Sequence, residues 1–168
     1  MKKKYQKWDK LLTYVFNHPD QRLTVRMAAT QARLPPSTTQ RYLQQLQEEE
    51  ILTKDNIPAH SAIMRFRKAV HLIEKLFESG LIEHLEKRLV PSAIVIFGSV
   101  RKGEYDKKSD IDLFVETTKA KTLNLAVFEK RIGHSIQMFI HKDIHELPAP
   151  LLNNVINGIK LSGYLKLK

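Results

Sequence analysis

The feature that most constrains the fold is an apolar segment that ends in two small residues and is soon followed by a pair of acids. Residues 93–97 are entirely apolar, which is typical of a buried central strand. Gly98 and Ser99 follow directly, and ten residues later Asp110 and Asp112 open a second apolar segment. Because side chains alternate along a strand, both carboxylates are expected on one face of it.

This arrangement favours a site for a metal ion and a phosphate. Two neighbouring carboxylates repel each other unless a cation lies between them, and Mg²⁺ prefers oxygen ligands, water and substrate phosphates. Gly98 followed by Ser99 at a strand end lets backbone N–H groups approach a phosphate closely. Arg101, Lys102 and Lys107 supply cations nearby. The residues therefore predict a site suited to nucleotidyl transfer, in which the metal polarises the α-phosphate and activates a hydroxyl.

The two motifs together resemble the signature of the DNA polymerase β-like nucleotidyltransferase superfamily. The strings Phe-Gly-Ser-Val-Arg-Lys-Gly-Glu at 97–104 and Ser-Asp-Ile-Asp-Leu at 109–113 are similar to its minimal nucleotidyltransferase branch. The resemblance covers about residues 92–168. It implies a small mixed β-sheet with helices. Known relatives of this branch include antitoxin-like enzymes that nucleotidylate an all-helical toxin, so a partner protein of that kind is implied as well.

The resemblance also implies what the motif residues bind. Asp110 and Asp112 would be the catalytic carboxylates and would hold Mg²⁺ or Mn²⁺. Gly98 and Ser99 would contact the triphosphate of an NTP. Two basic residues are further candidates for phosphate contact: Arg101 and Lys102.

Family members usually carry a third carboxylate on a neighbouring strand, and this chain departs from the pattern there. The candidate strand is 134–140, and Gln137 stands where the acid is expected. A glutamine cannot act as a general base, although its carbonyl oxygen can bind a metal or a hydroxyl. Glu116 has the same parity as the two aspartates but lies too far along its strand to be an obvious substitute. This departure leaves two alternatives for the domain: it catalyses nucleotidyl transfer, or it binds nucleotide or metal without transfer.

The first 67 residues predict a winged helix-turn-helix. Thr24 is the expected N-cap of the second helix, and Ser37 or Thr38 that of the third, after a turn made by two prolines. The expected elements are helices over 5–17, 24–32 and 37–50 and short strands over 51–54 and 62–66. Residues 23–52 resemble the winged helix-turn-helix family closely.

That second resemblance implies that the third helix enters the DNA major groove and that the hairpin flanks the backbone. The outer side chains with the chemistry to reach base edges or phosphates are Thr38, Thr39, Gln40, Arg41 and Gln44. Three glutamates at 48–50 would repel phosphate at the far end of this helix. Docking of a protein, or a scaffold role, is the alternative to binding double-stranded DNA.

The two resemblances, together with the apolar pattern of the remaining chain, imply an α+β protein with three parts. These are a winged helix-turn-helix domain (1–67), a connecting helix (68–90) and a minimal nucleotidyltransferase domain (91–168). The connecting segment is one helix or two divided at Gly80, and its apolar stripe suits domain packing or a homodimer seam. The last domain should add helices over 121–132 and 143–157, with an interruption near Pro148 and Pro150, and a strand over 159–167.

Composition narrows the class of protein and partner. The 168 residues include 28 Lys or Arg, 18 Asp or Glu and no Cys, for a formal charge of +10. Residues 1–67 hold 12 basic and 6 acidic residues, a net of +6, and residues 68–168 hold 16 and 12, a net of +4. The excess indicates an anionic partner. The lack of Cys excludes a disulfide framework, a thiolate zinc site and a cysteine nucleophile.

The sequence predicts a cytoplasmic protein with no membrane partner. A chain without Cys suits a reducing compartment. No apolar run approaches the ~20 residues that span a bilayer. The basic N-terminus is followed by polar residues where a signal peptide would be apolar.

Three functions follow from these features. The first is an Mg²⁺-dependent nucleotidyltransferase that binds ATP or another NTP and moves an NMP onto an acceptor the sequence does not identify. The second is a DNA-binding transcriptional regulator whose nucleotidyltransferase domain senses nucleotide or is catalytically degenerate. The third is a protein-interaction module. The intact Ser99, Asp110 and Asp112 favour the first function, whereas Gln137 favours the second.

Overall fold

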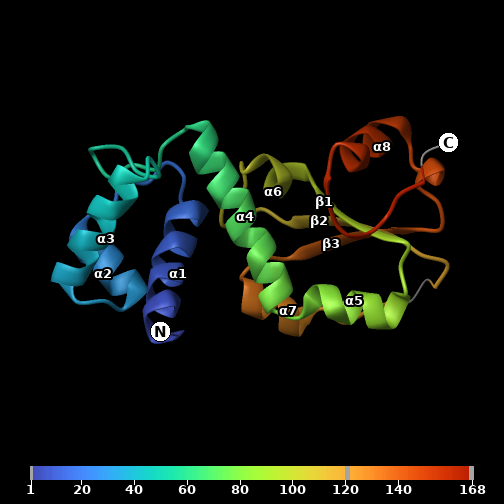
Figure 1. The fold of residues 1–168 in the computed structure, drawn as a ribbon, viewed down its shortest axis with the longest axis horizontal. Coiled ribbons are helices and arrows are strands. Elements are labelled where there is room, and N and C mark those ends of the chain that lie inside the picture. Colours follow the sequence, from blue (N-terminus) through green and yellow to red (C-terminus); the bar gives the residue numbers. More distant parts are fainter. Residues whose placement is uncertain (1, 120–121, 167–168) are drawn as a thin grey trace. The chain divides into compact units, whose positions relative to one another are not determined.

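Contacts between Cα atoms divide the chain into two units, Met1–Lys68 and Ala69–Lys168. The computed structural model describes residues 2–119 and 122–166, with side chains from residue 8 onward (Figure 1). The boundary between the units falls inside helix α4 (Ala62–Glu78). None of the described helices is long and apolar enough to cross a membrane.

The first unit contains three helices of a helix-turn-helix, α1 (Lys2–Asn17), α2 (Val25–Ala32) and α3 (Pro36–Glu48). They bury a common set of apolar side chains: Leu11, Val15, Phe16, Ala28, Leu43 and Leu46. Thr24 is the N-cap of α2, as predicted, because its hydroxyl oxygen accepts the N–H of Met27 at 3.2 Å.

The third helix begins differently from the prediction. Pro35 is its N-cap and makes no side-chain hydrogen bond, so neither Ser37 nor Thr38 caps it. Pro36 occupies the first turn, where a missing N–H removes no intrahelical bond and the fixed φ already suits a helix. The proline pair thus starts the helix two residues earlier than a cap at Ser37 would.

The wing is a short loop. Leu52 and Pro58 form one antiparallel bridge, and the N–H of Thr53 donates to the carbonyl of Ile57 at 2.8 Å. The return strand predicted over 62–66 is wrong, because these residues begin α4. Ser61 explains the change, since its hydroxyl oxygen accepts the N–H of Met64 at 3.1 Å as a helix N-cap does.

The connecting segment forms two helices, α4 and α5 (Leu81–Leu89). Gly80 separates them with a φ of +83°, a conformation that side-chain-bearing residues adopt only at a cost. Four residues of α5 are buried: Leu81, Ile82, Leu85 and Leu89.

A four-stranded sheet is the centre of the second unit, in the order β3-β2-β1-β4. Its strands are β1 (Ala93–Phe97), β2 (Ile111–Glu116), β3 (Ile136–His141) and β4 (Ile159–Gly163). β1 runs antiparallel to β2 and β4, whereas β2 and β3 are parallel. The α+β fold with a small mixed sheet is therefore confirmed.

Helices cover both faces of this sheet. α8 (Ala149–Ile156) lies on one side of the strands, and α5 and α7 (Ala126–Ile132) lie on the other (Figure 1). The α8 side forms an apolar cluster: Val95, Phe97, Phe114, Ile144, Leu147 and Val155. β1 is buried along its whole length, as the apolar run predicts.

Three predicted elements of this unit are shorter than expected. α7 begins at Ala126, whose N–H donates to the side chain of Asn124 at 3.1 Å, and the predicted start at Lys121 lies outside the described residues. The helix expected over 143–157 divides into a 3₁₀ turn (Ile144–Glu146) and α8, because Pro148 forces the preceding residue out of the helical region. β4 ends at Gly163, and residues 167–168 are not described.

Candidate active site

Strand register brings the two sequence motifs together. Phe97, the last residue of β1, pairs with Asp112 of the antiparallel β2, and Asp112 pairs on its other side with Gln137 of the parallel β3. Paired residues of neighbouring strands direct their side chains to the same face. Gly98 continues the chain from Phe97 into the short helix α6 (Gly98–Lys102). One row of the sheet therefore contains the end of the Gly-Ser motif, an acid and the glutamine.

Gly98 lies against the carboxylate of Asp112. Its φ is +68°, and a Cβ added there would stand 2.0 Å from Oδ2 of Asp112. A side chain at residue 98 would make this carboxylate move, and the positive φ by itself favours glycine. The backbone at the start of α6 and the Asp112 carboxylate share one small volume.

The two aspartates form an electrostatically unfavourable pair. Asp112 is half-buried within β2, and Asp110 is exposed just before that strand. Burial raises the pKa of Asp112, and the neighbouring charge of Asp110 raises it further. A cation between the two carboxylates would relieve both effects.

These residues fit a divalent ion that prefers oxygen. Among the described residues no group of three or more His, Cys, Asp or Glu is placed to hold a metal. Asp110 and Asp112 offer two carboxylates, and the exposed Gln137 offers an amide oxygen from the adjacent strand. Mg²⁺ is usually bound by one or two carboxylates together with waters and substrate phosphates. The donor set therefore suits Mg²⁺ or Mn²⁺ with a phosphate substrate.

Glu116, at the far end of β2, has a structural role. It pairs with His141, away from the row that contains Asp112. It is buried, and its carboxylate accepts the N–H of Ile144 at 2.9 Å and the hydroxyl of Ser92. These bonds join three segments of the unit, so Glu116 does not supply the missing third acid.

Hydrogen bonds within residues 106–109 hold the loop before Asp110 in a turn. Oδ1 of Asp106 accepts the N–H of Lys108 at 2.8 Å and the hydroxyl of Ser109 at 3.1 Å, while the N–H of Asp106 donates to Oγ of Ser109 at 2.9 Å. These bonds, the one from Lys108 foremost, lower the pKa of Asp106. In the sequence, the signal for this turn is an aspartate that precedes a serine by three residues.

The basic candidates lie close to the motif in sequence and on the surface. Arg101 and Lys102 are exposed in the last turn of α6, the same helix that begins at Gly98. Lys107 is exposed in the following loop. Ser99 is partly exposed, and its carbonyl accepts the N–H of Glu104 at 2.9 Å. Their contacts with phosphate stay predictions.

The outer face of α3 contains most of the residues predicted to meet DNA. Gln40, Arg41 and Gln44 are exposed and Thr38 is partly exposed. Thr39 does not belong to this face, because it is 0% exposed and its hydroxyl donates to the carbonyl of Pro35 at 3.0 Å. A buried, bonded hydroxyl cannot reach a base, so the prediction for this residue is wrong.

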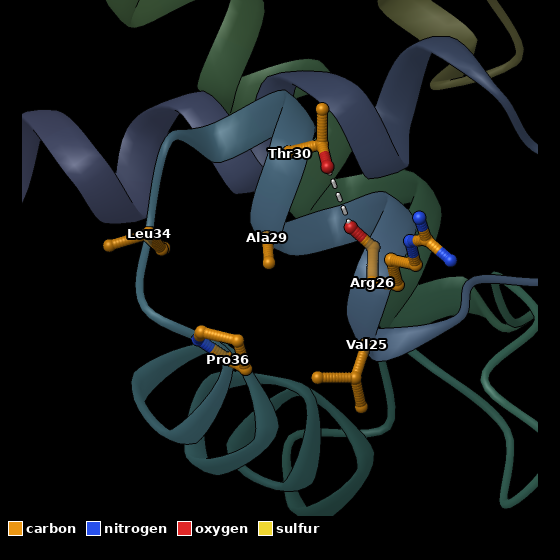
Figure 2. A pocket seen from close by; sticks show the side chains of 6 residues that line it. All are labelled: Val25, Arg26, Ala29, Thr30, Leu34 and Pro36. Atoms are coloured by element: carbon orange, nitrogen blue, oxygen red, sulfur yellow. Dashed lines mark hydrogen bonds between the residues drawn. The ribbon is translucent and has the colours of Figure 1, made fainter.

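An open pocket of about 480 Å³ lies between α2 and the start of α3 (Figure 2). Its lining is Val25, Arg26, Ala29, Thr30, Leu34 and Pro36. The hydroxyl of Thr30 donates to the carbonyl of Arg26 at 3.0 Å, so this polar group is engaged within its own helix. The pocket includes none of the predicted site residues.

Comparison with protein families finds one match within each unit of the chain. Residues 78–151 match the nucleotidyltransferase domain, and residues 14–56 match the IclR helix-turn-helix domain. The chain joins a helix-turn-helix domain to a nucleotidyltransferase domain. The nucleotidyltransferase match includes Gly98, Asp112 and Gln137, and the helix-turn-helix match includes α2 and α3. No curated protein and no solved structure matches the chain significantly.

Proposed function

We propose that the nucleotidyltransferase domain transfers an NMP from ATP or another NTP to an acceptor hydroxyl, with Mg²⁺ or Mn²⁺ as cofactor. The observation that carries the proposal is the packing of Gly98 on the Asp112 carboxylate, with Asp110 two residues away. A backbone turn against one carboxylate, with a second carboxylate close enough to repel the first, suits a triphosphate and its metal better than a structural role. The family match supports the same class of chemistry.

Each residue of the site has a proposed role. Asp110 and Asp112 would hold the metal, which when bound neutralises phosphate charge and activates the attacking hydroxyl. Backbone N–H groups at Gly98 and Ser99 would bind the triphosphate, with Arg101 and Lys102 as outer cations. Gln137 would orient the acceptor with its side-chain amide.

The reaction exchanges one phosphate linkage for another. The bond between the α-phosphorus and the oxygen that bridges to the β-phosphate breaks, and pyrophosphate leaves. The acceptor oxygen bonds to the α-phosphorus, and its proton goes to water. Because Gln137 is neutral, it does not take this proton.

The test is transfer of label to an acceptor. The purified protein is incubated with α-labelled ATP, GTP, CTP or UTP, Mg²⁺ and cell extract, beside the double variant Asp110→Ala, Asp112→Ala. A matched control is Glu83→Gln, which removes an exposed acid from α5. We expect labelled product from the wild type and from the Glu83→Gln variant, and none from the double variant. Equal labelling by the double variant, or none by the wild type with any nucleotide, would refute the proposal.

Gln137 favours a second function, a DNA-binding regulator that senses nucleotide. Residues 1–67 support DNA binding with the exposed Gln40, Arg41 and Gln44. Their 12 basic less 6 acidic residues give a net charge of +6. In that case NTP and Mg²⁺ would bind without transfer and would change the affinity for duplex DNA. Duplex binding measured with and without a non-hydrolysable NTP separates the two functions.

A further inference from the structure

The peptide groups on both sides of Asp110 are bonded to two consecutive residues at the start of β3. The carbonyl oxygen of Ser109 lies 2.9 Å from Nδ1 of His134, and the N–H of Ile111 donates to the carbonyl of Ser135 at 2.9 Å. A carbonyl oxygen only accepts hydrogen bonds, so Nδ1 of His134 carries the proton. The backbone that carries the Asp110 carboxylate is therefore held from the β3 side.

On the β1 side the strand pairing stops before Asp110. The last pair between β1 and β2 is Phe97 with Asp112, and the first pair between β2 and β3 is Ile111 with Ile136. Asp110 thus lies one residue before the start of β2, where its position depends on the hydrogen bonds of its neighbours. Asp112, by contrast, is fixed by strands on both sides.

The His134 ring is itself held in place. It is only 6% exposed, and the buried ring of Tyr105 meets it edge-on, with centroids 5.5 Å apart and planes at 88°. Two residues further on, the N–H of Ile136 donates to the carboxylate of Glu129 in α7 at 2.9 Å. The donor at Nδ1 is therefore presented by a packed ring on a strand that a helix anchors.

We propose that His134 is a positioning residue for Asp110, which it places for metal binding by donating from Nδ1 to the carbonyl of Ser109. The inference rests on the proposed function, because it gives Asp110 the role of a metal ligand. Pairs of ligands hold a metal well only within about 0.5 Å of the productive geometry. Removal of the Nδ1 donor of His134 should let the backbone at Asp110 move, while Asp112 keeps its position.

Two substitutions separate the donor from the ring. His134→Phe retains a ring against Tyr105 and removes the donor, whereas His134→Asn removes the ring and retains an N–H near the position of Nδ1. The probe is Mn²⁺ alone, titrated without nucleotide and followed by electron paramagnetic resonance. We expect His134→Phe to weaken Mn²⁺ binding about tenfold, and His134→Asn to stay within about threefold of the wild type.

A second measurement does not depend on how the variants fold. In the wild type labelled with ¹⁵N-histidine, the Nδ1–H of His134 should be observed and should exchange slowly with solvent. A deprotonated Nδ1 at His134 would overturn the proposal. So would Mn²⁺ affinity that is lost in a folded His134→Asn variant but retained in His134→Phe, because the ring and not the donor would then matter.

Asp110→Asn distinguishes this inference from the proposed function. If that variant binds Mn²⁺ as tightly as the wild type, Asp110 is no metal ligand and both proposals fail. If it loses Mn²⁺ while a folded His134→Phe binds within twofold of the wild type, the site stands and the positioning role alone is overturned. Loss in both variants with retention in His134→Asn is the expected result.

Discussion

The carboxylate of Asp112 occupies the space that a side chain at Gly98 would need. A Cβ added at residue 98 would stand 2.0 Å from the Asp112 carboxylate oxygen Oδ2. The contact joins the residue that follows β1 to the second residue of its antiparallel neighbour β2. It couples the conformation of the proposed phosphate-binding turn to the position of the proposed metal ligand. The first prediction tests this coupling.

Gly98→Ala should reduce NMP transfer about 100-fold, because displaced reacting groups lose alignment. The added methyl must move the Asp112 carboxylate or the turn itself. Gly80→Ala is the matched control, since Gly80 has a similar φ of +83° but nothing within 4 Å of an added Cβ. It should lose about 1 kcal/mol of stability from backbone strain and retain activity. Equal activity in the two variants, from initial rates, would show that the contact is not needed.

Asp112→Asn should stabilise the metal-free protein at neutral pH, by roughly 0.5 kcal/mol after allowance for solvent screening. The folded protein disfavours the ionised form, so the pKa of Asp112 lies above the 3.8 of an unfolded chain. The charged carboxylate therefore destabilises the fold above that raised pKa. The penalty fades as the pH falls from there towards 3.8.

Thermal melting of wild type and Asp112→Asn in a chelator, at pH 7 and near pH 4, measures this effect. The variant should melt higher at pH 7, and the gap should close at the acidic end. Asp106→Asn is the control of opposite sign, because hydrogen bonds lower the pKa of Asp106 and its ionised form supports the fold above 3.8. A wild type that outmelts Asp112→Asn at pH 7 would contradict the prediction.

Gln137→Glu should tighten Mg²⁺ binding about tenfold, since a third carboxylate adds charge beside Asp112. The register places residue 137 next to Asp112 on the parallel strand. Isothermal titration with Mg²⁺ gives the affinity, and Gln31→Glu adds the same charge at an exposed position of α2 as a control. Transfer that rises along with affinity would show that the glutamine limits turnover. An unchanged affinity would place residue 137 outside the metal site.

Glu116→Ala should cost about 2 kcal/mol, because it leaves the buried N–H of Ile144 without its acceptor. Urea denaturation gives the change in the free energy of unfolding. Glu78→Ala, at an exposed position of α4, is the control and should cost under about 0.5 kcal/mol. Mn²⁺ affinity should be unchanged in the folded fraction, and its loss would mean that Glu116 takes part in the metal site after all.

Arg41→Ala should weaken binding to duplex DNA about tenfold and should lower the slope of log affinity against log salt by about one. Arg41 is exposed on α3. Arg65→Ala removes the same charge from α4 and should leave the affinity within about twofold. Fluorescence anisotropy at several salt concentrations gives both quantities. Equal losses in the two variants would indicate a diffuse charge effect and not recognition by α3.

Local pattern explains the parts of the fold that the sequence predicted well. The buried strand β1 and the cap at Thr24 each depend on neighbours a few residues apart. Residues 62–66 show the limit of such reasoning. The pattern of apolar and polar residues in this segment fits a strand or a helix equally. The hydroxyl of Ser61, which caps the first turn, favours the helix.

By itself, the sequence determined the chemistry available to this protein: a strand that ends in Gly-Ser, two acids of one parity and a glutamine where an acid was expected. Only the tertiary structure decided which groups meet. The pairing of Asp112 with Gln137, the burial of Thr39, the diversion of Glu116 to Ile144 and the bond from His134 to Ser109 all join distant residues or depend on packing. Strand register and burial come from the whole core, so no short stretch of sequence contains them.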